Sequence, residues 1–292
     1  MNKKKITRLL LIAFVCISML SGCGQQAANT SETTPSQISV ASTPEPTPTP
    51  TPVPTPEPKK EIQWDTDTLK NDSGKTLIKC ISDRKDGRYH SGFGIVSSQG
   101  TVILADPVYT PGDKGYLKAD IITVSHGHSD HYDQMFLDKM EGYAEIASIK
   151  PRDFTVKDVN VFGVLASHTS NYPNEATPSN VIFVYDLDGL RIAHMGGMGQ
   201  LEMLPEQLEK LGQLDIIFTG ITNLPNNGTS TAKNIKIIEQ LKPKIVIPTH
   251  YNDDVLSETI EHFGVKEVEK MPELVISKED LKDAEMRFII VE

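Results

Sequence analysis

A run of six residues near the middle of the chain carries four side chains that can bind a metal ion. His126, His128, Asp130 and His131 lie within it, and Gly127 separates the first two histidines. Neutral imidazole nitrogen and carboxylate oxygen are good zinc ligands. A tight loop can direct alternate side chains toward two different points, and glycine lets the backbone turn sharply between ligands. The spacing therefore predicts a metal-binding loop.

An apolar, β-branched segment at residues 121–125 comes directly before this loop and predicts a buried strand that ends there. An ordinary solvent-exposed loop at a strand end is the alternative interpretation. It fits poorly, because three of the eight histidines in the chain fall within these six positions. We therefore interpret the loop as the chemical centre of the protein.

From about residue 61 onward, short apolar runs are broken by glycine, aspartate and asparagine. Helical spacing of apolar residues predicts helices at 205–211, 231–241 and 256–263. The predicted strands are 76–81, 92–97, 101–105, 121–125, 145–148, 159–166, 181–185, 190–194, 215–219 and 244–248. Strands dominate the first part and alternate with helices later. This order indicates an α/β domain whose sheets are covered by helices, and it argues against a doubly wound Rossmann domain.

The pattern His-x-His-x-Asp-His after a strand resembles the signature of the metallo-β-lactamase superfamily, and the similarity extends along most of residues 76–292. Asp106, at the end of a predicted strand, resembles the family aspartate that supports the metal loop. Residues 90–93 resemble the opening strand of the branch that includes ascorbate-phosphate lactonase and related metal-dependent hydrolases. The resemblance implies a four-layered αββα sandwich with the metals at one edge of the two sheets.

Two further segments resemble metal-ligand motifs of this family. His168 follows the predicted strand 159–166 where the family places its next metal histidine, and residues 247–251 resemble the last ligand motif of the lactonase-like branch. The resemblance therefore implies three ligands for each of two metals, with His126, His128 and His168 at the first and Asp130, His131 and His250 at the second.

One position departs from the family pattern. The aspartate that bridges the two metals normally stands in a His-x-Gly-Asp context, but the chain reads His194-Met195-Gly196-Gly197. A three-histidine site still holds zinc with an open position and brings bound water toward a pKa of about 7. The second site is expected to be weaker, empty, or selective for another metal such as manganese. Asp130 then serves as a general base or orients a ligand histidine.

The remaining histidines carry several interpretations. His194 could orient a ligand, replace one, or pack in the core, and we favour the last. His90 could line the site or only cap a strand. His262 lies in a charged helical stretch and is expected to be solvated, and residues 223–227 are expected to form a loop near the site.

The resemblance implies a zinc-dependent hydrolase in which metal-bound hydroxide attacks a small ester, lactone or phosphate ester. β-Lactam hydrolysis has little separate support. The alternative is a surface lipoprotein that keeps the fold but binds a ligand or partner without turnover, because Gly197 replaces the bridging aspartate. Restoring a carboxylate with Gly197→Asp would test that alignment through the affinity of the second site.

The amino terminus has the features of an export signal. Basic residues at positions 3–5 and 8 precede an apolar run, 9–20, that is too short to span a bilayer. Small residues then precede Cys23, as in the bacterial lipobox. The order and spacing favour a lipoprotein signal peptide, 1–22, over an ordinary signal peptide. We expect lipid on Cys23 to anchor the chain to a bacterial membrane outside the cytoplasm.

Residues 23–60 are expected to form a disordered tether between the lipidated cysteine and a folded domain at 61–292. Proline occupies every second position from Pro44 to Pro58, which removes backbone donors and favours extended polyproline II. Removal of the signal segment leaves Cys80 as the one cysteine beyond Cys23, and it is expected to be a buried apolar residue.

The charge of the chain excludes one class of partner. Loss of the signal segment removes four basic residues and no acidic one, so the formal net charge changes from −10 to −14. Nucleic-acid binding requires clustered lysine and arginine. The composition therefore favours a small-molecule substrate over nucleic acid.

Overall fold

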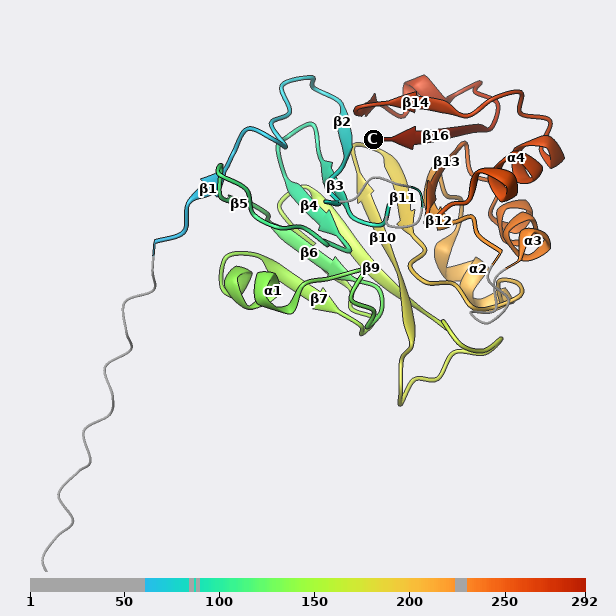
Figure 1. Cartoon of the computed structure of the whole chain (residues 1–292), viewed down its shortest axis with the longest axis horizontal. Coiled ribbons are helices and arrows are strands. Elements are labelled where there is room, and N and C mark those ends of the chain that lie inside the picture. Colours follow the sequence, from blue (N-terminus) through green and yellow to red (C-terminus); the bar gives the residue numbers. More distant parts are fainter. Residues whose placement is uncertain (1–60, 84–86, 88–89, 224–229) are drawn as a thin grey trace, which may run out of the picture. The chain divides into compact units, whose positions relative to one another are not determined.

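Two β-sheets packed face to face form the centre of the domain (Figure 1). The computed structural model describes residues 61–83, 87, 90–223 and 230–292. The expected signal segment, Cys23 and the tether lie outside the described residues. Lys59–Glu292 form one unit, and the account below concerns that unit alone.

The first sheet has six strands in the order β15-β2-β3-β4-β6-β7. Their bounds are β15 Leu274–Ile276, β2 Thr76–Cys80, β3 Phe93–Val96, β4 Val102–Ala105, β6 Ile121–Val124 and β7 Glu145–Ser148. Strands β4, β6 and β7 are parallel to one another. The carboxyl ends of β4 and β6 therefore meet at one edge of the sheet.

The second sheet has eight strands in the order β14-β16-β13-β12-β11-β10-β9-β8. Their bounds are β14 Glu269–Met271, β16 Arg287–Val291, β13 Ile245–Thr249, β12 Ile216–Gly220, β11 Leu190–His194, β10 Asn180–Leu187, β9 Val159–Ala166 and β8 Phe154–Val156. Strands β11, β12 and β13 are parallel. Strand β10 is antiparallel to both β11 and β9, so β9 ends at the same edge as β11 and β13.

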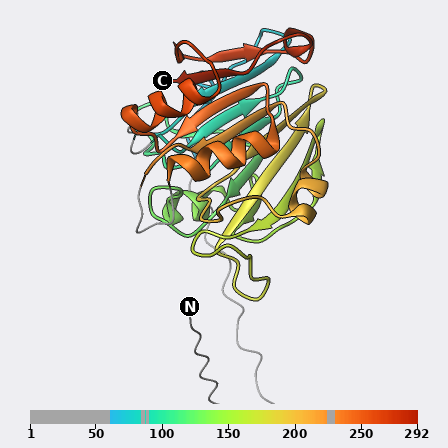
Figure 2. The same ribbon diagram turned by 90° about the vertical axis from the view of Figure 1, so that its right-hand side faces the viewer.

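Helices cover the outer faces of both sheets and complete four layers. They are α1 Gln134–Met140 on the six-stranded sheet and, on the eight-stranded sheet, α2 Pro205–Leu211, α3 Thr231–Leu241 and α4 Asp253–His262. Figure 2 shows α3 and α4 in front of the sheets. A short pair, β1 Trp64–Asp65 with β5 Tyr116–Leu117, and a 3-10 helix at Glu279–Leu281 complete the elements.

Three apolar clusters hold these layers together. Phe93 on β3 and Phe183 on β10 belong to the cluster between the sheets. Ile237 on α3 joins the cluster under the helices of the eight-stranded sheet, and Phe136 on α1 joins the third cluster. Because each sheet buries apolar residues on both faces, the four layers are stabilised chiefly by hydrophobic burial. The expected αββα architecture is therefore confirmed.

Each predicted strand and helix has a counterpart in the structure, with small differences at the ends. Helix α4 begins at Asp253, three residues earlier than predicted, because Asn252 caps it. The Asn252 side chain accepts hydrogen bonds from the backbone N–H groups of Asp254 and Val255, at 3.0 and 3.3 Å. Helix α1 and strands β1, β5, β8, β14, β15 and β16 were not predicted. Within the described part of the chain, no helix is long and apolar enough to cross a bilayer.

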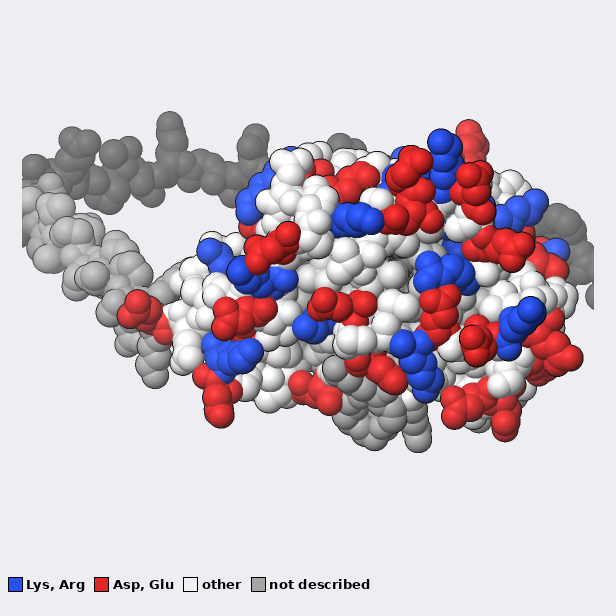
Figure 3. Space-filling model, turned by 90° about the horizontal axis from the view of Figure 1, so that it is seen from above, with Lys and Arg blue, Asp and Glu red and all other residues white. Residues whose placement is uncertain are grey.

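The surface mixes charges of both signs. On the face shown in Figure 3, lysine and arginine side chains are interspersed with aspartate and glutamate. Such mixing gives no large field of one sign over that face.

Candidate metal centre

The candidate site lies where strands of both sheets end. His126, His128 and His131 follow β6 on the six-stranded sheet. On the eight-stranded sheet, His168 follows β9 and His250 follows β13. The parallel arrangement places the carboxyl ends of these strands at a common edge, which explains how residues far apart in the sequence meet. Backbone hydrogen bonds join the sheets at this edge, from Val181 N to Ser125 O and from His250 N to His90 O.

The structure brings the six predicted ligands together as two groups of three. His126, His128 and His168 form one, and Asp130, His131 and His250 form the other, with candidate ligand atoms within 4.8 Å of one another in each group. These are the two sets that the resemblance implies. Metal binding by these side chains remains a prediction. It requires the ligand atoms of each group to lie close together, and they do.

The rings of the first group pack closely. The His126 ring stacks on that of His168 with centroids 4.8 Å apart, and His128 lies edge-on to His168 at 4.6 Å. His126 is buried, His168 is half-buried and His128 is exposed. The group therefore reaches from the interior to the solvent, so that a ligand held there would remain accessible on one side.

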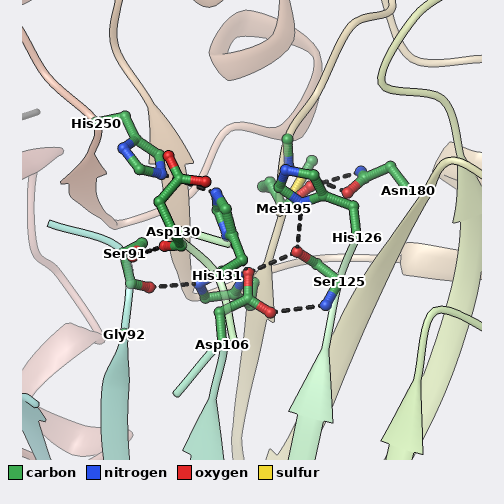
Figure 4. Close-up of polar contacts among 12 residues, drawn as sticks. Ser91, Gly92, Asp106, Ser125, His126, Asp130, His131, Asn180, Met195 and His250 are labelled. Carbon is green, nitrogen blue, oxygen red and sulfur yellow. Dashed lines mark hydrogen bonds and ion pairs between the residues drawn. The ribbon is translucent and has the colours of Figure 1, made fainter. Parts of the chain in front are cut away.

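The second group adjoins the first through His131. The His131 and His126 ring centroids are 3.9 Å apart. On its other side, Nε2 of His131 lies 2.8 Å from Nε2 of His250. Asp130 and His250 lie beside His131 in Figure 4, and Ser91 donates a 2.6 Å hydrogen bond to the Asp130 backbone carbonyl.

Asp106 supports the 126–131 loop through hydrogen bonds to Ser125 and His131, as the resemblance implies. Its carboxylate accepts hydrogen bonds from Ser125 N at 2.7 Å, from Ser125 Oγ at 2.5 Å and from His131 Nδ1 at 2.6 Å (Figure 4). Burial alone raises the pKa of Asp106, but the neighbouring His194 and His131 and the hydrogen bond from His131 outweigh it. The pKa is therefore held below its usual range, and the group is ionised.

Asp106 and His250 share an uncommon backbone conformation. Their φ angles are +47° and +42°, in the left-handed region that non-glycine residues rarely adopt. Both residues come directly after a strand, Asp106 within one residue of β4 and His250 within one residue of β13. Strained backbone of this kind clusters at functional sites, where the surrounding structure fixes it.

The hydrogen bonds also fix which imidazole nitrogen carries the proton. Ser125 Oγ has one hydrogen, which it donates to the carboxylate of Asp106. It must then accept from Nδ1 of His126, 2.9 Å away. Nδ1 of His168 donates to the carbonyl oxygen of Gly197 at 2.6 Å, and Nδ1 of His131 donates to Asp106. In all three rings Nε2 is left with its lone pair.

These lone pairs are the strongest reason for which a metal fits the site. Such a lone pair accepts a hydrogen bond or binds a cation, and Nε2 of His131 lies 2.8 Å from Nε2 of His250. Burial and then the neighbouring His131 lower the pKa of His126 to about 2, and burial also lowers the pKa of His168. Both rings are therefore neutral near pH 7, which is the form that binds zinc. The donor set fits the metal that the family resemblance implies.

Gly197 lies against the ligand histidines. A Cβ atom at this position would lie 2.5 Å from Nδ1 of His168 and 2.7 Å from Nε2 of His126. The missing side chain thus points at the place where a bridging aspartate would be expected. The His126 and His168 rings leave no room for a Cβ there, however, and the Gly197 N–H donates to Asn180 Oδ1 at 3.0 Å. The residue is part of a tight turn closely packed on the site.

A cavity of about 650 Å³ opens onto both groups. All six predicted ligands line it, together with Gly197, and Asn223 marks the edge of the predicted loop 223–227. The rest of that loop lies outside the described residues. The size is typical of a small-molecule site.

The other histidines differ in their surroundings. His194 is buried, as favoured from the sequence, and its Nδ1 lies 3.6 Å from Asp106 Oδ2. His90 is also buried, stacks on Phe93, and does not line the cavity formed by the described residues. His262 is exposed, and its Nε2 lies 2.9 Å from Glu239. The expectation that it is solvated is thus correct, with an added ion-pair partner.

Sequence reasoning missed three residues that complete the site. Ser125 joins Asp106 to His126, Asn180 holds the turn at Gly197, and Lys233 on α3 lines the cavity. Ser125 comes directly before the loop, and this position could have identified it. Asn180 and Lys233 carry no local signal. Cys80 is a free, buried cysteine, as expected.

The fold and the site together define an αββα domain with a histidine- and aspartate-rich candidate metal centre at one edge of its sheets. A family model described as a beta-lactamase superfamily domain matches residues 89–250, more than half of the chain. The chain belongs to the metallo-β-lactamase superfamily.

Similar proteins include two described as UPF0173 metal-dependent hydrolases. That of Thermococcus onnurineus is 27% identical over 187 residues, which cover 56% of this chain and 82% of that protein. That of Methanosphaera stadtmanae is 29% identical over 194 residues, which cover 56% and 81%. A solved structure described as a Zn-dependent hydrolase of the metallo-β-lactamase superfamily, from Thermotoga maritima, is similar with a TM-score of 0.53. It is 20% identical and covers 74% of this chain and all of that chain.

Proposed function

We propose that this chain is a zinc-dependent hydrolase of a small ester, lactone or phosphate ester. The observation that carries the proposal is the orientation of three imidazoles. His126, His131 and His168 each donate through Nδ1 to a protein oxygen, which leaves Nε2 of each ring with its lone pair. Relatives described as metal-dependent hydrolases support the same reaction class.

His126, His128 and His168 would hold the first zinc, and Asp130, His131 and His250 would hold a second metal, zinc or manganese, more weakly. Zinc bound at such a site activates water and polarises a carbonyl or phosphoryl group. The chain positions these ligands through Asp106, which fixes His131 directly and His126 through Ser125. The half-exposed carboxylate of Asp130 lies at the cavity and would accept a proton as general base.

Metal content and turnover test this proposal together. The full chain, expressed without chelators, should contain about one zinc per chain, and His168→Ala should lower that content while the exposed-site control His262→Ala should not. Zinc- and manganese-loaded protein should then hydrolyse at least one class among lactones, phosphate esters and thioesters. A preparation that contains no metal and takes up no added zinc would contradict the proposal.

Gly197 favours a second candidate function. Because position 197 carries no carboxylate and the His126 and His168 rings pack against it, the chain could bind a ligand or partner with its fold and one metal and without turnover. Zinc-loaded protein that hydrolyses none of these classes, yet binds one of them in a calorimetric titration, would favour this function over hydrolysis.

The proposal includes a location. The lipobox-like segment before Cys23 supports a lipoprotein anchored to a bacterial membrane outside the cytoplasm, at the cell surface or in the periplasm, with its small-molecule substrate there. Cys23→Ser should abolish incorporation of labelled palmitate and shift the protein from the membrane fraction to the soluble one. Unchanged labelling of the variant would refute the anchor without affecting the hydrolase proposal.

A further inference from the structure

Lys233 is a buried cation in the wall of the candidate metal centre. It lies on α3, is 4% exposed, and lines the same cavity as His126 and His168. Its Nζ donates a hydrogen bond to the backbone carbonyl of Met198, in the turn that contains Gly197. An ammonium group has three donors, so this contact leaves others for a further partner.

The position of Lys233 is unfavourable for the stability of the helix. Ser230 caps α3 and accepts a hydrogen bond from the Lys233 backbone N–H, which places the lysine in the first turn. A positive charge is disfavoured there by the helix dipole. Among the described residues, the ion pairs do not include Lys233, and burial lowers its pKa to about 8. A lysine kept in such a place despite these effects points to a role in the site.

The charges around the cavity favour an anion near this lysine. Position 197 carries no carboxylate, and the acidic residues that line the cavity are Asp130 and Asp254. Asp130 belongs to the group with His131 and His250. Lys233 and the first histidine group line the same cavity.

We propose that Lys233 binds an oxyanion group of the substrate, either phosphate or carboxylate, beside the His126, His128 and His168 group. This inference rests on the proposed hydrolase function and narrows its substrates to anionic esters or lactones. An ammonium that already has a fixed hydrogen bond to Met198 needs little reorganisation to receive such a group.

Inorganic phosphate and succinate are the probes for a calorimetric titration of the zinc-loaded full chain. Wild-type protein should bind at least one of them, and Lys233→Met should weaken that binding by about 10-fold or more with zinc content unchanged. Lys236 is the matched control, because it lies on the same helix with a 51% exposed side chain. Lys236→Met should bind as wild type does.

Three results would overturn the inference. The first is that wild-type protein binds neither anion at millimolar concentration. The second is that Lys233→Met binds the anion as tightly as wild type does. The third is that Lys236→Met weakens anion binding as much as Lys233→Met does. The second result would also appear if the anion were held by zinc alone. Preference between phosphate and succinate distinguishes the two oxyanion chemistries.

A measurement on wild-type protein covers the case in which Lys233→Met does not fold. Cyanate carbamylates neutral amines, and peptide mass spectrometry reports each lysine separately. Bound anion should slow modification of Lys233 and leave that of Lys236 unchanged, and equal rates with and without anion would contradict the inference. If the protein hydrolyses neutral esters but binds no anion, the inference about Lys233 is wrong and the hydrolase proposal stands. If the protein binds anions through Lys233 but hydrolyses no substrate, the hydrolase proposal is wrong and anion binding stands.

Discussion

The carboxylate of Asp106 and Nδ1 of His131 are joined by a buried hydrogen bond of 2.6 Å, and this bond turns the opposite nitrogen of the ring toward His250. The same carboxylate accepts the hydroxyl of Ser125, which in turn accepts from Nδ1 of His126. One side chain thus sets the orientation of a ligand in each group.

Asp106→Asn should weaken zinc binding about 10- to 100-fold, although it removes no predicted ligand. The amide has one acceptor oxygen where three donors converge, so either His131 or Ser125 loses its partner. Competition with a chromophoric chelator measures the affinity. Asp186→Asn is the control, because Asp186 pairs with Arg191 outside the site and should leave the affinity unchanged. Equal affinities for all three proteins would contradict the role of Asp106.

Gly197→Ala should lower both zinc affinity and stability. The new methyl group would lie within 3 Å of the His126 and His168 rings, and overpacking of this kind costs about 1–3 kcal/mol. Gly112→Ala is matched to it, since a Cβ there meets no atom within 4 Å. Thermal unfolding with and without zinc reports both effects.

The same contact changes the expectation for Gly197→Asp. Sequence alone suggests that a restored carboxylate would strengthen the second metal site. The structure predicts weaker binding at the first group, because the Cβ displaces His126 or His168 before the carboxylate can act. Two bound metals per chain in this variant, with affinity at the first undiminished, would show that the turn adjusts freely.

Metal-free protein should lose stability as the pH falls below about 6.5. Burial lowers the pKa of His126, to about 2, and of His168 and His194. Between the unfolded and folded pKa values the unfolded state binds protons that the native state does not, so stability falls as pH falls. Each such histidine contributes up to about 1.4 kcal/mol per pH unit.

Urea unfolding at pH 7.5 and pH 5.5, with zinc removed, checks this dependence. The free energy of unfolding should be lower at pH 5.5. His262→Gln should not change the difference, because His262 is exposed. A free energy of unfolding that rises toward pH 5.5 would mean that these rings are charged in the native state.

Much of the fold was predictable because its strands are short apolar runs and its sheets are buried on both faces. Helix α2 was predicted to the residue, Pro205–Leu211, from the helical spacing of its apolar residues. Helix α1 was not, because its cap, Asp133, lies only two residues beyond the metal loop. Strand β16 was missed although its central residues are apolar, and it pairs in parallel with β13 and β14, which no local pattern reveals.

The metal centre was predictable for a different reason. Its ligands are histidines and an aspartate that stand at strand ends, and the family resemblance supplied the partners His168 and His250. Lys233 and Asn180 could not be identified in this way, because their roles depend on packing against the Met195–Met198 turn, far away in the sequence. The sequence shows that position 197 lacks a carboxylate. It does not show that Gly197 packs closely against the His126 and His168 rings.

The two sheets contribute the imidazoles unequally, with His126, His128 and His131 from one and His168 and His250 from the other. A cation bound by these imidazoles would cross-link the two sheets of the sandwich at their common edge. Neither half of the polypeptide possesses a complete set of predicted ligands, so metal binding would have to await docking of the carboxyl-terminal half. With the export that we propose from the segment before Cys23, the ion would be acquired from the surroundings in which folding finishes.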